Sequence, residues 1–495
     1  MISGSLWLSG ARAITNLLAF LSTIVLARLL APADFGIVAL GTTIMVMITA
    51  VTEMSLSQAL VHHPDPTDDH FHTVWTLGAA RAVLLAGLMA AAAYPAAWFY
   101  HEPRLAPVVL ALAASVVMGG LANPRMVTFT RQLIFWQTFM LSVAGRLSVV
   151  LVSVAVAIVW KSYWALIAGS MAGQVVSTLL SYTVAPYRPR VVWRHARELW
   201  SFSIWLTLGQ AINTINWRFD QLLVGNILGR TALGHYSVGD NLAQMPTREA
   251  TYPLRQTLFP ALARIADDPA RLRAAYQRAQ GLVTLCALPI GIGFALVADP
   301  VVRLAMGEKW APAIPVIQAL SSVFALQTIG DLVQPLGMSK GRTRLLFQRD
   351  LQMFFIRLPV IIAGTMIFGL PGLIYSRVAT GLGGIVMNMT VVRRITGLSL
   401  GAQMQVNTRS LAAAAAMVAA TLAFQHAWPI HGDAMRVVAG IAGSMVVAAI
   451  AYIGTAALLW RLSGRPDGAE AEVLRLAGQA RARLGARFSR GATDA

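Results

Sequence analysis

The sequence lacks the charge that a soluble protein carries on its surface. Charged residues make up only 12% of the 495 positions, whereas 57% are hydrophobic. A soluble globular chain carries about 25% charged residues, so this composition excludes a series of soluble domains. Long uncharged apolar windows occur instead, for example 105–124, 279–298 and 437–460. Because about 20 apolar residues cross the hydrocarbon core, the chain is predicted to be an all-α polytopic membrane protein.

Cysteine is nearly absent too. Cys286 stands alone, inside an apolar stretch, so an intrachain disulfide is impossible and a thiol site is not expected. The N-terminus lacks a basic segment followed by a short apolar core, and we interpret it as the first span, not as a removable signal peptide. The formal net charge is +18, yet no basic run is interleaved with aromatic residues in a polar segment. A nucleic-acid partner is therefore not expected.

Enzyme motifs are missing as well. HExxH, GxSxG and P-loop patterns do not occur at a plausible position, and the longest outward connection, around 300–311, has only about a dozen residues. A membrane glycosyltransferase or polymerase would present acidic residues on a large outward loop. One histidine-rich segment resembles a metal site, but its spacing matches no structural zinc pattern. We interpret it as a solvated turn and expect no metal, no cofactor and no enzyme activity. The segment holds His62, His63, His70 and His72 with Asp65, Asp68 and Asp69.

What is present is a series of about fourteen predicted spans. They cover 5–30, 35–61, 73–100, 105–124, 136–160, 163–186, 199–228, 233–261, 279–299, 312–338, 346–369, 372–392, 410–428 and 437–460. With the N-terminus inside, 24 of the 39 Lys and Arg fall in cytoplasmic connections or the tail, and six fall in outward connections. Basic loops are retained in the cytoplasm, so both termini are predicted to be cytoplasmic.

An internal repeat suggests two lobes. A shift of 198 residues lays 29–36 on 227–234, and it places Gly41 on Gly239. Six spans separate the copies, an even number, which predicts two pseudo-symmetric parallel six-helix lobes around a central cavity. The expected divisions are an N-lobe at 1–190, a C-lobe at 191–395, a two-helix unit at 396–460 and a basic cytoplasmic tail at 461–495. In that tail a lipid-surface helix and a disordered segment are both compatible with the pattern.

The repeated segments also resemble a known family. ARLLAPADFGIVAL (27–40) and RFDQLLVGNILGRTALGHYSVGDNLAQMP (218–246) resemble the polysaccharide-transporter branch of the multidrug/oligosaccharidyl-lipid/polysaccharide exporter superfamily. Segments 254–278 and 307–320 are similar to its longer Wzx-type members. The two copies differ at Ala31 against Gly229 and at Val38 against Tyr236, which bears on the packing of the hairpins.

This resemblance implies an inner-membrane flippase with alternating access. Its substrate would be an undecaprenyl-pyrophosphate-linked oligosaccharide used for exopolysaccharide or lipopolysaccharide assembly. Membrane lipids are expected partners, and a polysaccharide polymerase and export machinery are candidate ones. Two alternatives stay open: a flippase for the peptidoglycan lipid precursor, and a cation-coupled exporter of small amphiphiles, which would more naturally line its cavity with acidic groups.

Charges inside predicted spans are the candidate site residues. An intramembrane arginine costs about 2.5–3.5 kcal/mol or more at a helix centre, so each one needs a reason. We predict that a cationic cavity for the pyrophosphate-linked glycan is lined by Arg12, Arg81, Arg146, Arg218, Arg248 and Arg255. Snorkelling or a structural ion pair is the alternative. The candidates for ion coupling or ion pairing are Asp220, Asp240, Glu53, Glu249 and Asp331. Pro246 and Pro253 predict a kinked or broken helix around Arg248.

Overall fold

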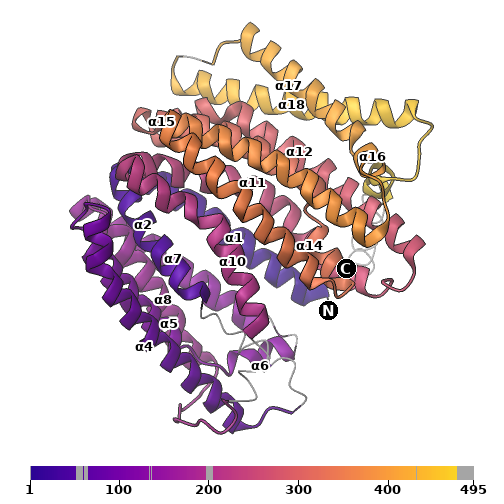
Figure 1. Cartoon of the computed structure of the whole chain (residues 1–495). Coiled ribbons are helices and arrows are strands. Elements are labelled where there is room, and N and C mark those ends of the chain that lie inside the picture. Colours follow the sequence, from indigo (N-terminus) through magenta and orange to yellow (C-terminus); the bar gives the residue numbers. More distant parts are fainter. Residues whose placement is uncertain are drawn as a thin grey trace, which may run out of the picture. The chain divides into compact units, whose positions relative to one another are not determined.

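The structure is a computed structural model that describes residues 2–51, 60, 65–132, 134, 136–196, 204–430 and 432–475. All regular secondary structure in these residues is helical (Figure 1), which confirms the all-α prediction. Nine of the described helices are long and apolar enough to cross a membrane. Glu53, His62, His63 and the tail from 476 onward lie outside the described residues.

The helices form two compact units. Unit 1 comprises Met1–Val238, Ala305–Trp310 and Thr365–Leu370, and unit 2 comprises the remaining residues. The helices of unit 1 are α1 (Ile2–Leu29), α2 (Pro32–Val51), α4 (Asp68–Phe99), α5 (Leu105–Gly120), α6 (Met126–Arg131), α7 (Trp136–Trp160), α8 (Trp164–Val184), α10 (Ile204–Ile227) and the first part of α11 (Gly229–Ala263). The boundary between the two units therefore lies inside α11.

Unit 2 begins in α11 and continues to the end of the described chain. Its helices are α12 (Pro269–Met306), η1 (Glu308–Ala313), α13 (Ile314–Gln327), η2 (Thr328–Gly330), α14 (Val333–Ser339), α15 (Thr343–Thr396), α16 (Leu400–Gln405), α17 (Thr408–Ala427) and α18 (Ala434–Leu462). α15 covers two predicted spans and contains one non-helical residue, Gly369, with φ 63° and ψ −138°. Gly369 is the last residue of the first of those predicted spans, 346–369.

Small residues bring the helices of unit 1 close together. A Cβ atom on Gly169 of α8 would lie 1.8 Å from Ser153 Oγ of α7, and one on Gly120 of α5 would lie 2.1 Å from Ala82 Cβ of α4. Close approach of backbones at small residues is typical of membrane helices, because lipid offers no hydrophobic force to press larger side chains together.

The two copies of the repeated segment meet inside unit 1. A Cβ atom on Gly36 would lie 1.8 Å from Arg230 O, and a Cβ atom on Gly234 would lie 1.8 Å from Pro32 O. Both glycines and both carbonyls are 198 positions apart in the sequence, which is the shift of the repeat. The contact between α2 and α11 is therefore reciprocal, as a local two-fold axis requires.

Residues 305–310, which comprise the end of α12 and the start of η1, belong to unit 1 and not to unit 2. The Trp310 side chain is fully buried, and its Nε1 donates a hydrogen bond to Ala27 O at 2.9 Å. Its ring packs edge-on against Phe35 and His235. Lys309 Nζ donates to Leu30 O at 2.7 Å. We call residues 305–310 the Trp310 clasp, because they hold the turn between α1 and α2.

In unit 2, large apolar side chains from α12, α14 and α15 form one core. It contains Leu272, Tyr276, Val283, Val333, Leu336 and Val392. A second cluster packs α12 against α17 and α18 and contains Leu288, Ala413, Met417 and Tyr452. α11 enters this unit without a break at Pro246 or Pro253. Each proline removes one backbone donor, and the flanking turns keep the helix continuous.

Candidate functional site

The six predicted cavity arginines are divided between the units. Four lie in unit 1, on α1, α4, α7 and α10, and two lie in unit 2, on α11. In unit 1 these are Arg12, Arg81, Arg146 and Arg218, and in unit 2 they are Arg248 and Arg255. Their surroundings differ, so each one is described with its own contacts.

In unit 1, Arg81 is tied to the backbone of a neighbouring helix. Its Nη2 donates to Thr49 O of α2 at 3.0 Å. Arg12 and Arg146 are half-buried, whereas Arg218 is exposed on α10. The Nε of Arg146 is buried and meets no hydrogen-bond acceptor. A buried donor without an acceptor costs about 1–3 kcal/mol, so Arg146 is a residue whose position needs an explanation beyond packing.

In unit 2, both α11 arginines face a carboxylate. Arg248 Nε donates to Glu249 Oε1 at 3.1 Å, at an exposed position. Arg255 Nη2 contacts Asp331 Oδ2, and both side chains are partly exposed. Asp331 lies between η2 and α14, where the helical path is interrupted.

The other predicted carboxylates have different partners. Asp220 is buried on α10, and its Oδ2 accepts a hydrogen bond from the Tyr236 hydroxyl at 2.7 Å. Beside it, Thr43 of α2 donates to Gln221 Oε1 at 2.6 Å. Asp240 pairs with Arg377 at 3.0 Å. Tyr236 is a residue of the second repeat copy, where the first copy has Val38, so this hydroxyl contact belongs to one copy only.

Two in-span arginines of α15 were not predicted as site residues. Arg357 and Arg377 are 4% and 5% exposed, which makes them more buried than any of the six. Arg377 also lies over the ring of Phe324, with its Cζ 5.8 Å from the ring centroid. The sequence signal was present, since both arginines interrupt apolar segments in the same way as the six.

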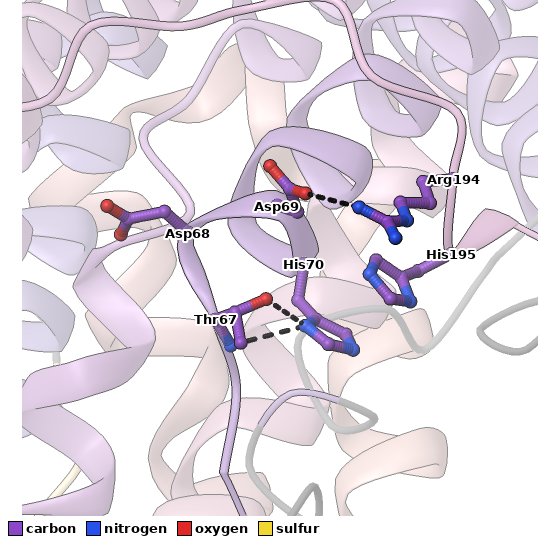
Figure 2. A pocket seen from close by; sticks show the side chains of 6 residues that line it. All are labelled: Thr67, Asp68, Asp69, His70, Arg194 and His195. Carbon is purple, nitrogen blue, oxygen red and sulfur yellow. Dashed lines mark hydrogen bonds and ion pairs between the residues drawn. The ribbon is translucent and has the colours of Figure 1, made fainter.

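The described part of the histidine-rich segment forms a pocket at the start of α4. Figure 2 shows this pocket, which has a volume of about 430 Å³ and is lined by Thr67, Asp68, Asp69, His70, Arg194 and His195. The His70 and His195 rings stack with their centroids 3.7 Å apart. Arg194 pairs with Asp69 at 3.6 Å. Among the described residues, no group of three or more His, Cys, Asp or Glu could hold a metal ion.

Hydrogen bonds cap the N-terminal end of α4, where this pocket lies. The Thr67 N–H donates to His70 Nδ1 at 3.2 Å, which caps the helix. Asp68 accepts from Arg125 Nη2 at 2.6 Å. Acidic residues in a first turn complement the helix dipole. Nearby, burial raises the pKa of Tyr187 to about 12, Tyr182 adds to this shift, and Arg125 opposes it. The pocket thus contains a neutralised set of charges and helix-capping contacts.

Together, these features define a polytopic all-α membrane protein with arginines inside its apolar helices. Residues 25–315, more than half of the chain, match the family described as "Polysaccharide biosynthesis protein". The chain belongs to this family, which confirms the resemblance found in the two repeated segments.

Relatives of known name extend over most of the chain. "Lipopolysaccharide biosynthesis protein WzxC" of Escherichia coli (strain K12) is 25% identical over 375 residues, which cover 75% of this chain and 76% of the relative. "Succinoglycan biosynthesis transport protein ExoT" of Rhizobium meliloti (strain 1021) is 24% identical over 308 residues, covering 61% of this chain and 62% of the relative.

Solved transporters share the fold. The lipid II flippase MurJ in an inward closed conformation superposes with a TM-score of 0.72 at 9% identity, covering 93% of this chain and 99% of that one. An inward-facing multidrug resistance MATE family transporter of the MOP superfamily gives a TM-score of 0.58 at 12% identity, covering 78% and 96%. At these identities the likeness concerns the fold alone.

Proposed function

We propose that this protein is a flippase for undecaprenyl-pyrophosphate-linked oligosaccharide repeat units. It moves them from the cytoplasmic to the outer leaflet of the bacterial inner membrane by alternating access. The product is used to assemble an exopolysaccharide or a lipopolysaccharide. The observation that carries this proposal is the family match over residues 25–315, joined to arginines within membrane-spanning helices.

The relatives support the class of substrate. Their names refer to biosynthesis of lipopolysaccharide, to transport in succinoglycan biosynthesis and to biosynthesis of teichuronic acid. All three products are surface or exported glycans, and their assembly requires sugars to cross a membrane. The fold supports transport, because transporters share it.

The arginines support the anionic head group. Stripping water from a pyrophosphate and from many hydroxyls is unfavourable in lipid, whereas cations facing a hydrated path remove much of that cost. The polyprenyl tail can stay among the lipid chains during transfer. We propose that Arg12, Arg81, Arg146, Arg218, Arg248 and Arg255 supply this positive charge, and that Glu53, Asp220, Asp240, Glu249 and Asp331 pair with arginines or couple an ion.

The test is complementation in a strain that lacks its own polysaccharide flippase. Each of the six arginines is changed to Ala and to Lys, and glycan output is measured with the protein level controlled by blotting. Arg→Ala is expected to lower output more than Arg→Lys, which keeps the charge but loses the planar fork. Loss of two charges is expected to lower output more than loss of one, because several cations share a diffuse anion.

Arg303→Ala is the matched control. Arg303 pairs with Asp299 at 2.9 Å, in an exposed pair near the outward end of α12, and its loss should leave output unchanged. If all six Ala variants are expressed normally and restore full output, the arginines are structural and the cationic-path mechanism is wrong. Rescue of a strain depleted of its lipid II flippase, without rescue of the polysaccharide strain, would favour the peptidoglycan-precursor alternative.

A further inference from the structure

Among the ion pairs described in unit 2, the pair between Arg255 and Asp331 is distinguished by a buried arginine Nε that has no acceptor. Its side chains remain 40% and 34% exposed, although Arg255 lies within a predicted span. The Nη2 of Arg255 contacts Asp331, whereas its Nε is buried and has no acceptor. The guanidinium therefore uses its Nη2 donor, whereas the adjacent Nε donor makes no hydrogen bond.

Two other ion pairs of unit 2 show what a complete pair and a buried pair look like. Arg409 fills both donors, with Nε 2.7 Å from Glu470 Oε1 and Nη2 2.9 Å from Glu470 Oε2. Arg377, paired with Asp240, is almost fully buried and lies over Phe324. Separating Asp240 from Arg377 would take a carboxylate away from a buried charge, which is strongly unfavourable. The Arg255–Asp331 pair is neither complete nor buried.

Asp331 occupies a position from which its carboxylate can leave the pair. It lies in the interruption between η2 and α14, not in the middle of a helix. Its partial exposure means that the carboxylate can be hydrated after it leaves Arg255. Arg255 then presents Nη2 and Nε side by side. A phosphate group offers several anionic oxygens and accepts such a fork through two hydrogen bonds.

We propose that Asp331 is an internal counter-anion, which occupies Arg255 until a phosphate oxygen of the substrate replaces it. This inference rests on the proposed function and assigns a specific exchange to one of its arginines. Before the exchange, Arg255 contacts Asp331 through Nη2 alone. After the exchange, Nη2 and Nε both donate to phosphate oxygens, so the buried Nε gains an acceptor. In the absence of substrate, Asp331 keeps Arg255 neutralised, so this arginine does not attract other anions.

The exchange makes Asp331 a competitor of the substrate. Replacing Asp331 by Asn keeps the size of the side chain and removes the competing charge. Binding of a pyrophosphate lipid should then become tighter, because the binding-competent state of Arg255 no longer has to be released from its partner. A gain of roughly 3- to 10-fold in affinity is expected, where tenfold corresponds to about 1.4 kcal/mol.

The experiment uses the full chain in lipid nanodiscs, titrated with undecaprenyl pyrophosphate and followed by microscale thermophoresis. Asp331→Asn and, as a second variant, Asp331→Ser should lower the Kd. Arg255→Ala should raise it, and Arg255→Ala combined with Asp331→Asn should equal Arg255→Ala alone, because Asp331 acts only through Arg255. Asp299→Asn is the matched control: it removes the same charge from the exposed Arg303–Asp299 pair of unit 2, whose arginine is not among the proposed substrate-binding residues.

Two results would overturn the inference. One is an affinity gain in Asp331→Asn no larger than that in Asp299→Asn, which would mean that net charge alone acts. The other is a gain that persists in the double variant. Failure of the proposed function looks different: the wild-type protein would then neither bind undecaprenyl pyrophosphate nor restore glycan output in the complementation strain.

Discussion

At the scale of single residues, Gly36 and Gly234 have the least room for change. A Cβ atom at either position would stand 1.8 Å from a backbone carbonyl oxygen, and a backbone cannot move aside as a flexible side chain can. We expect Gly36→Ala and Gly234→Ala each to destabilise the protein by about 1–3 kcal/mol or more, as overpacking does.

Thermal unfolding of the detergent-solubilised variants checks this expectation. Gly87→Ala in α4 is the control, because a Cβ atom there meets nothing within 4 Å. An alanine inside a helix is favoured over glycine, so this variant should be as stable as the wild type or slightly more stable. Equal unfolding temperatures for Gly36→Ala and Gly87→Ala would contradict the close crossing of α2 and α11.

Cys286 offers a second prediction at this scale. The thiol is partly buried on α12, and burial of a single cysteine in an apolar setting makes it behave as a small apolar residue. Cys286→Ala should therefore restore the same glycan output as the wild type in the complementation strain, at an equal protein level. Loss of output at a normal level would reveal a role for the thiol.

The sequence placed the charges of the candidate site but not their partners. A charge inside an apolar span is visible without a structure, as Arg255 and Asp331 were. Their pairing was not visible in the sequence, because the two residues lie on separate elements and no local pattern indicates a contact between them. The same holds for Arg377 and Asp240, which are 137 positions apart. Such pairs depend on the packing of distant helices.

At the scale of elements, hydrophobicity predicted most of the helices. Each predicted span overlaps a helix of the described structure, and 136–160 has the same bounds as α7. The misplaced features are the ones that hydrophobicity does not control. α12 extends ten residues before its predicted span because Pro269 can begin a helix. Gly330 and Pro335 flank Asp331 and are typical of an interruption, but the apolar residues on either side favoured one continuous span.

The Trp310 clasp carries a prediction for these elements. Trp310→Ala removes a large buried ring and should cost about 3–5 kcal/mol of stability. Trp310→Phe keeps much of the apolar area but leaves Ala27 O without its donor, and should cost about 1–3 kcal/mol. Thermal unfolding measures both losses.

Trp98→Phe provides the comparison, since Trp98 is 80% exposed on α4. It should unfold at the wild-type temperature. If Trp310→Phe is no less stable than Trp98→Phe, the hydrogen bond to Ala27 does not hold the turn between α1 and α2.

At the scale of the whole molecule, the predicted orientation can be tested directly. We expect both termini in the cytoplasm, because Lys and Arg are concentrated in the connections on that side. Reporter fusions after Arg190, Asp268 and Arg394 should all report a cytoplasmic location. A periplasmic signal after Arg190 would contradict the two-lobe organisation, with divisions at 190 and 395, since this connection joins the proposed lobes.

The reciprocal contact of Gly36 and Gly234 also limits how the repeated segments can diverge. A residue on a two-fold axis faces its own counterpart, so the two copies must fit each other as well as their own surroundings. Val38 and Tyr236 lie two positions further along each copy and have become different, whereas the glycines have not. A larger side chain at either glycine would clash with the backbone of the other copy. A substitution at Gly36 or at Gly234 therefore changes the same contact, and the two positions are constrained together.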